Sequence, residues 1–213
     1  MSLLVKNNYF IHVPKTAGTW MSNFLCQNFE DDLVIVTNVN TRHTGYKPFE
    51  HMKGINKFAF VRNPIDWYAS YWAFKMKWRW KPGFNAKFDG LCESYDFPEF
   101  INNVVTKYPT FYQDTIVNLI GEKGDKVTFV GKYENLHVDF KKMLSLSGLG
   151  VFTLKSLHDF MPINVSKESK KVIIEKTYSK ELKIKIAEQN QLIAKWFDYD
   201  LDKIINKEET CIE

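Results

Sequence analysis

The alternation of apolar and polar positions predicts strands interleaved with helices. Short runs rich in β-branched and aromatic residues occur at 9–13 (YFIHV), 33–37 (LVIVT), 57–61 (KFAFV) and 127–136 (VTFVGKYENL). We interpret 33–37 as a short buried strand and 127–136 as a strand that continues into a helix. Apolar residues recur at helical spacing from Thr19, with Gly18 or Thr19 near the N-cap, and again over 98–108 and 180–197. The pattern predicts an α/β fold of three layers: a mostly parallel central sheet with helices on both faces.

The helix predicted after the strand at 57–61 has clear start signals. Asn63 is placed as the N-cap, Pro64 is the first helical residue, and Asp66 lies in the first turn. Two apolar stripes then flank a polar seam that contains Asn63, Asp66, Ser70 and Lys77. At helical spacing Ser70 lies below Asn63 on the same side of the helix.

Two predicted loops leave the same edge of the sheet. Residues 14–19 follow the first strand and residues 62–64 follow the third. Ligands of open α/β sheets bind beyond the carboxyl ends of the strands, so this edge is the expected binding site. The aromatic stretch 78–95 is interpreted as an insertion at the same rim, with no structure assigned to it.

Composition narrows the class of protein. The 213 residues are 45% apolar, which suits one globular domain over 1–213. A net charge of +4 is too small to indicate nucleic acid as the main partner. The widely spaced Cys26, Cys92 and Cys211 predict neither a metal site nor a disulfide framework. With no signal peptide or membrane-spanning run in the sequence, we expect a soluble, cytoplasmic protein.

The first loop, VPKTAGTW (13–20), has the features of an anion site. N–H groups at a helix start have no partner within the helix, and the helix dipole adds partial positive charge there. Ala17 and Gly18 permit close backbone approach, Thr16 and Thr19 offer hydroxyl donors, and Lys15 brings a full charge. Lys15 precedes the glycine, however, whereas a Walker loop has the order G-x-x-x-x-G-K-[ST]. An ordinary strand-to-helix turn with a solvated lysine is the alternative.

The second loop adds an arginine at the end of a buried strand. The Arg62 guanidinium suits a phosphate, and the Ser70 hydroxyl in the polar seam can complete such a site. The alternative is a helix-capping Asn63 with a solvated Ser70. The two loops thus predict two anion sites at the same edge of the sheet.

These motifs resemble those of the sulfotransferases that use 3′-phosphoadenosine-5′-phosphosulfate (PAPS). VPKTAGTW resembles their 5′-phosphosulfate loop and FVRNPIDWYASYW (60–72) their 3′-phosphate motif, while FVGKYENLHVDFKKML (129–144) resembles their strand and YE-x-L segment. The resemblance implies PAPS as donor, adenosine 3′,5′-bisphosphate (PAP) as product, and no metal. It assigns the 5′ end to Lys15, Thr16, Ala17, Gly18, Thr19 and Trp20, and the 3′-phosphate to Arg62 and Ser70. Ser166 and Lys167 match a loop that closes over the nucleotide.

The resemblance also implies the catalytic residues. Lys15 would neutralise charge on the oxygen that sulfur leaves. His43, before Tyr46 and Phe49, resembles the general base of glycosaminoglycan sulfotransferases of the uronyl 2-O type. Glu50 is the reserve base, and Arg42 either orients an acidic acceptor or is solvated. We expect His12 to be structural and His51, His137 and His158 to be solvated or at helix ends.

The acceptor is open at this point. Aromatic Trp78, Trp80 and Phe84 alternate with Lys77, Arg79 and Lys81, and this stretch is either a rim that binds sugars or a helix end packed on the core. The sequence thus predicts sulfuryl transfer from PAPS to an acceptor hydroxyl, with a saccharide as the expected acceptor. The alternatives are a P-loop nucleotide kinase, which the missing G-K-[ST] order disfavours, and a non-catalytic nucleotide-binding protein.

Overall fold

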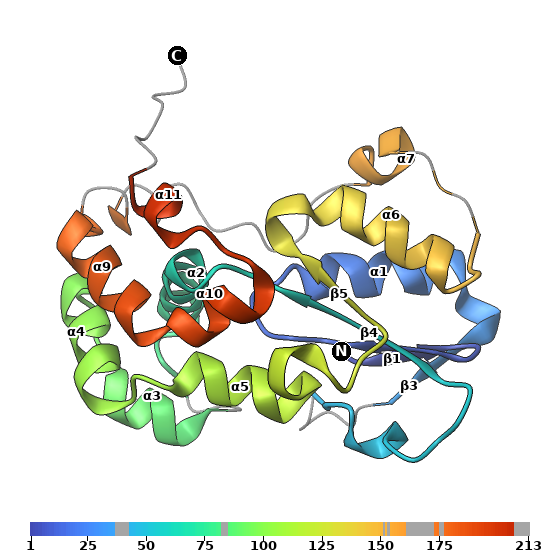
Figure 1. Ribbon diagram of the computed structural model, residues 1–213, viewed down its shortest axis with the longest axis horizontal. Coiled ribbons are helices and arrows are strands. Elements are labelled where there is room, and N and C mark those ends of the chain that lie inside the picture. The colour runs from blue at the N-terminus through green and yellow to red at the C-terminus, as the bar shows by residue number, and fades with distance from the viewer. Residues whose placement is uncertain are drawn as a thin grey trace. The chain divides into compact units, whose positions relative to one another are not determined.

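The computed structural model describes residues 1–36, 43–81, 85–150, 152, 154–160, 173–174 and 177–206. The chain divides into two compact units, each built from two separate segments. Unit 1 consists of Met1–Arg62 and Asp114–Val165, and unit 2 of Asn63–Gln113 and Ser166–Glu213. Figure 1 labels the elements of both units. The interpretation of the whole chain as one domain stays a prediction.

Unit 1 contains a mixed sheet of five strands in the order β3-β1-β2-β4-β5. The strands are β1 (Leu3–Val5), β2 (Asn8–Ile11), β3 (Leu33–Ile35), β4 (Asn56–Val61) and β5 (Phe129–Lys132). The pairings β2–β4 and β4–β5 are parallel, whereas β1 is antiparallel to both β2 and β3. The α/β class is therefore confirmed, but the sheet is mixed where we expected it to be mostly parallel. The difference comes from β1, which forms a hairpin with β2 and was not predicted.

The edge strand β3 is exposed, so its interpretation as a buried strand was wrong. Val34 is 56% exposed and Ile35 is 52% exposed. In the described structure β3 pairs with β1 alone, because it ends the sheet. An apolar run of three to five residues fits an edge strand and a central strand equally well.

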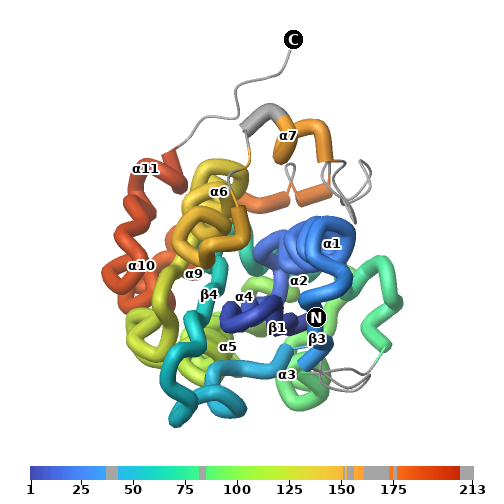
Figure 2. The backbone as a smooth tube through the Cα atoms, turned by 90° about the vertical axis from the view of Figure 1, so that its right-hand side faces the viewer, coloured from blue at the N-terminus to red at the C-terminus, as the bar shows by residue number. Residues whose placement is uncertain are grey.

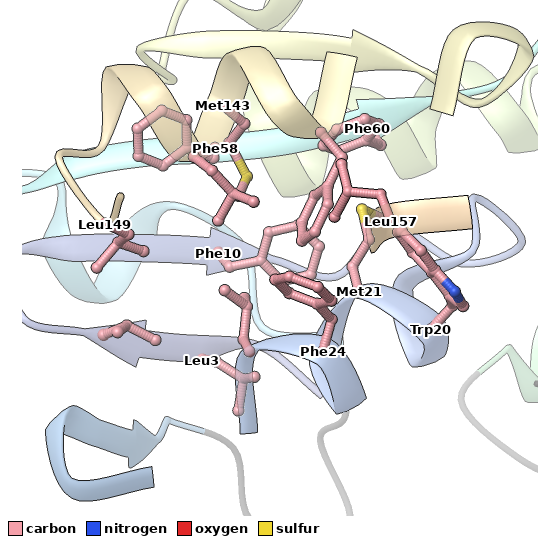
Figure 3. Close-up of a cluster of buried hydrophobic side chains, with 14 residues drawn as sticks. Leu3, Phe10, Trp20, Met21, Phe24, Phe58, Phe60, Met143, Leu149 and Leu157 are labelled. Carbon is pink, nitrogen blue, oxygen red and sulfur yellow. The ribbon is translucent and has the colours of Figure 1, made fainter. Parts of the chain in front are cut away.

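The main core of unit 1 lies between the sheet and the helices α1 (Gly18–Asn28) and α6 (Leu136–Leu146). Figures 1 and 2 show these two helices on the same side of the strands. In Figure 3, Phe10 of β2, Met21 and Phe24 of α1, and Met143 of α6 gather in this layer. The opposite face of β2 is covered as well, since Tyr9 is fully buried and its ring centroid lies 4.4 Å from that of Phe49.

Shorter helices complete unit 1. They are η1 (Glu30–Asp32), η2 (Lys47–Phe49), η3 (Glu122–Gly124), η4 (Tyr133–Asn135) and α7 (Leu154–His158). The chain passes from unit 2 back into unit 1 within α5 (Phe111–Ile120). Near the end of α5, the Leu119 carbonyl accepts a 2.9 Å hydrogen bond from the Tyr46 N–H. The segment that follows His43 is thereby attached to α5.

The described part of unit 2 is helical. Its helices are α2 (Pro64–Lys77), α3 (Ala86–Cys92), α4 (Phe97–Lys107), α9 (Lys180–Gln189), α10 (Gln191–Phe197) and α11 (Leu201–Ile205). The helix predicted over 180–197 is interrupted at Asn190, which has φ −119° and whose side chain donates to the Ile186 carbonyl. None of the helices described is long and apolar enough to cross a bilayer.

Candidate active site

The loop between β2 and α1 contains two non-glycine residues in the left-handed region. Lys15 has φ 64° and Ala17 has φ 61°. Such a conformation costs an L-residue roughly 1–2 kcal/mol, so the surrounding contacts must hold it in place. Left-handed residues in a turn direct successive N–H groups to one side, which is the geometry of anion-binding nests. The backbone of this loop is therefore suited to the phosphosulfate that the sequence predicted.

The start of α1 supports the same assignment. The N-cap is Ala17, one residue before the predicted Gly18 or Thr19. An alanine side chain cannot accept the capping hydrogen bond that serine, threonine or aspartate would accept. The first N–H groups of α1 and the positive end of its dipole are thus suited to a bound anion.

Two of the residues predicted to bind the anion make side-chain hydrogen bonds within the protein. Thr16 is 1% exposed, and its hydroxyl donates to the Val13 carbonyl at 2.9 Å. A hydroxyl has one hydrogen, so in this conformation Thr16 has only its backbone N–H to donate to a ligand. Trp20 is buried in the core of unit 1, and its indole N–H donates to the Phe160 carbonyl at 3.0 Å. The Trp20 indole thus anchors α1, and the predicted contact with the 5′ end of the nucleotide falls to the Trp20 backbone.

Gly18 has a packing role that was not predicted. Its α-carbon faces the ring of His12, whereas the close approach of an anion to its backbone stays a prediction. A β-carbon at this position would lie 2.0 Å from His12 Cδ2, which is far inside van der Waals contact. Glycine is therefore required here for the packing of a histidine against the helix start.

His43 is held against the end of β2 by a backbone contact. Its Nδ1 lies 2.8 Å from the His12 carbonyl oxygen. A carbonyl can only accept, so Nδ1 carries the hydrogen, and Nε2 of the neutral ring then has the lone pair. The two imidazole rings meet edge to face with centroids 4.7 Å apart. His12 itself is 8% exposed and just beyond β2, as expected for a structural histidine.

Arg62 follows β4 and stacks on an aromatic ring. Its Cζ lies 4.0 Å from the ring centroid of Tyr133, which begins η4 directly after β5. Stacking on an aromatic face fixes the plane of a guanidinium, which is what bidentate recognition of a phosphate requires. Tyr133 belongs to the YE-x-L segment, and its contact with Arg62 was not predicted.

The structure shows fewer contacts for the other residues that were predicted to bind the nucleotide. Ser70 is half-buried on α2, within unit 2. Asn63 is confirmed as the N-cap of α2, because its Oδ1 accepts from the Asp66 N–H at 2.9 Å. Thr19 is half-buried in the first turn of α1. Ser166, Lys167 and Arg42 lie outside the described residues.

The remaining histidines and the reserve base are less suited to catalysis. His51 and Glu50 are exposed after η2. His137 packs edge to face on Trp20, with ring centroids 5.3 Å apart, and its ring lies 3.9 Å from that of His158. Burial, and then the charge of His158, lower the pKa of His137. No cluster of three or more potential metal ligands occurs among the residues that the structure describes.

The residues of the predicted aromatic rim differ in their exposure to solvent. Trp80 is 4% exposed and packs on Phe100, with ring centroids 5.7 Å apart. Its place in a sugar-binding rim was therefore wrong, and the alternative of a helix end packed on the core holds for this residue. Trp78 is 50% exposed beside the 44% exposed Phe74. Phe84 lies outside the described residues.

The comparison with protein families decides the class of enzyme. The model of the sulfotransferase family matches residues 6–202. The chain belongs to the sulfotransferase family. Membership of the sulfotransferase family, which the sequence motifs indicated, is thereby confirmed, and with it sulfuryl transfer as the general activity. The match spans segments of both units, including the C-terminal helices that carried no recognised motif. No curated protein and no solved structure matches the chain.

Proposed function

We propose that this sulfotransferase moves the sulfuryl group of PAPS to a hydroxyl group of a saccharide, with His43 as general base. The observation that carries the proposal is the hydrogen bond from His43 Nδ1 to the His12 carbonyl. His12 directly follows β2, and the left-handed residues Lys15 and Ala17 come within the next five positions. The candidate base and the candidate anion loop are therefore attached to the same strand end within unit 1.

The roles proposed for the individual residues come from the family resemblance. PAPS supplies the sulfuryl group. His43 Nε2 accepts the proton of the acceptor hydroxyl as the acceptor oxygen bonds to sulfur. Lys15 stabilises the negative charge that the 5′-phosphate gains when its bond to sulfur breaks. The backbone N–H groups of residues 16–20 hold the 5′ end, and Arg62 and Ser70 hold the 3′-phosphate. Ser166 and Lys167 belong to the segment proposed to close over the nucleotide.

The saccharide acceptor rests on two sequence features. The first is the resemblance of the His43–Phe49 segment to glycosaminoglycan sulfotransferases. The second is the part of the aromatic and basic stretch that stays on the surface, namely Trp78 with Lys77 and Arg79. Assays of sulfate transfer to a panel of saccharides, phenols and amines test this assignment. Activity on phenols or amines alone contradicts it.

The decisive experiment measures PAP release from PAPS in the presence of acceptor. Lys15→Ala and His43→Ala are each expected to lower kcat by at least about 100-fold, the usual contribution of general acid–base or electrostatic catalysis. His43→Ala should bind PAP as the unmodified chain does, because His43 acts on the acceptor. The matched control is His51→Ala, which removes an exposed histidine. Wild-type kcat in His43→Ala contradicts the assignment of the base.

Measurements of nucleotide binding distinguish a sulfotransferase from the two alternative classes of protein. Tighter binding of ATP with Mg²⁺ than of PAP would indicate a nucleotide kinase. PAP binding without release of PAP from PAPS, across the whole acceptor panel, would indicate a non-catalytic nucleotide-binding protein.

A further inference from the structure

We propose that Tyr9 is a positioning residue for the general base, because its hydroxyl fixes the backbone that carries His43. The inference rests on the proposed function of His43. It concerns a tyrosine in the middle of β2 that no sequence motif singled out. Tyr9 is fully buried, and its side chain lies on the face of the sheet opposite to the main core.

The Tyr9 hydroxyl contacts the two residues that follow His43. It lies 2.9 Å from the Thr44 carbonyl and 3.1 Å from the Gly45 carbonyl. Both acceptors share the single hydroxyl hydrogen. Burial raises the pKa of Tyr9 to about 12, so the hydroxyl remains a donor throughout the neutral pH range.

A second set of contacts joins the same backbone to His12. The Ser2 hydroxyl donates to the Thr44 carbonyl at 3.0 Å and accepts from the His12 N–H at 3.1 Å. His43 Nδ1 donates a hydrogen bond to the His12 carbonyl. Residues 2, 9, 12, 43 and 44 thus form a polar network around the end of β2, which we call the His43 network.

The position of His43 depends on this network because its ring makes one of the contacts. The bond from Nδ1 selects the tautomer with the lone pair on Nε2, and it requires that His43 stay within hydrogen-bonding distance of His12. Tyr9 attaches the next two residues to the same strand. Loss of its hydroxyl lets the segment move away from β2 and lengthens the bond that orients the imidazole.

The test removes a single oxygen atom. Tyr9→Phe keeps the ring that packs on Phe49 and deletes the hydroxyl. The expected result is a fall in kcat of about tenfold, a part of the contribution of a general base, with KM for PAPS and affinity for PAP unchanged. The matched control is Tyr178→Phe, since Tyr178 is also buried and donates to the Ile65 carbonyl within unit 2. Equal kcat values for the two variants would overturn the proposal.

A double variant separates positioning from a general loss of stability. If Tyr9 acts through His43, Tyr9→Phe has no further effect on kcat in a His43→Ala background. A second tenfold loss in that background would overturn the proposal, because it would show that Tyr9 acts elsewhere.

Nitrogen-15 NMR of the imidazole rings gives a readout that does not depend on turnover. The His43 signals are assigned by their absence from the spectrum of His43→Ala. We expect a ring protonated on Nδ1 in the unmodified chain and a mixture of tautomers in Tyr9→Phe. An unchanged His43 spectrum would overturn the inference even if no acceptor is found. An inactive unmodified chain that shows the expected spectral change would instead refute the proposed function alone.

Discussion

Two polar networks, one in each unit, are built from different kinds of groups. The His43 network of unit 1 joins hydroxyl, imidazole and carbonyl groups, and its His12 Nδ1 lies 2.6 Å from the N-terminal ammonium of Met1. The network of unit 2 contains full charges: Lys75 Nζ lies 2.7 Å from Asp89 Oδ2, and each side chain is 6% exposed. We call the latter the Lys75–Asp89 network. Both contain buried polar groups, so burial of polar groups alone does not identify an active site.

The two networks differ in the groups that their hydrogen bonds connect. In the Lys75–Asp89 network the Tyr71 hydroxyl donates to Asp89 Oδ1 at 2.7 Å, and Lys75 also donates to the Lys81 carbonyl. Its groups bond to one another and join α2 to the segment that leads into α3, as expected of a structural ion pair. The His43 network holds Nδ1 of a half-buried imidazole, and Nε2 of the same ring is the proposed proton acceptor. A network that orients a reactive group from one side is the better candidate for catalysis.

The largest expected effect on stability comes from breaking the charged network. Lys75→Met leaves the Asp89 carboxylate buried without its cation, and we expect the free energy of unfolding to fall by about 3–5 kcal/mol. Urea denaturation measures this loss. The matched control is Lys77→Met, which changes an exposed lysine on the same helix. A loss below about 1 kcal/mol would show that the pair is no more important than a surface ion pair.

Arg62→Ala tests a cation whose proposed partner is a ligand. We expect the affinity for PAP to weaken by about 2–3 kcal/mol, as for a lost charge-assisted bidentate contact. Arg62→Lys should lie in between, because it keeps the charge but loses the planar stack on Tyr133. Calorimetric titration measures both variants. Equal affinity in the unmodified chain and Arg62→Ala would refute the assignment to the 3′-phosphate.

Gly18→Ala disturbs the His43 network without removing a polar group. The added β-carbon would lie 2.0 Å from His12 Cδ2, so the ring or the helix start must move, at a cost of about 1–3 kcal/mol. We expect kcat to fall as well, since His12 contacts His43. Thermal unfolding and steady-state kinetics measure the two effects. Gly90→Ala is the control, because a β-carbon there meets nothing within 4 Å, and Gly18→Ala should differ clearly from it.

The smallest effect is expected from a histidine outside both networks. The folded state lowers the pKa of His137, first through burial and then through the charge of His158. The unfolded chain therefore binds the proton more readily, and stability should fall as pH decreases from the ordinary histidine pKa of about 6.5 towards the lower folded value. Melting temperatures across this range should show a weaker pH dependence in His137→Gln than in His51→Gln. Identical profiles would contradict the predicted direction.

The order of residues along the chain was enough to predict the strand–loop–helix segments, the Asn63 cap and the family. These features depend on residues within a few positions of one another, where apolar periodicity, cap chemistry and motif order can be read directly. Even the interpretation of His12 as structural followed from its position inside a strand pattern. The catalytic roles of Lys15 and His43 stay predictions.

The tertiary structure alone decided which distant residues meet. It added β1 to the sheet, exposed β3 at the edge, buried Trp80, and placed Gly18 against the ring of His12. The contacts of Tyr9 with Thr44 and of Arg62 with Tyr133 join residues that are far apart along the chain. Such contacts depend on strand order and on which face of the sheet a side chain occupies. One-dimensional periodicity does not contain that information, because it records the face of each element but not its neighbour.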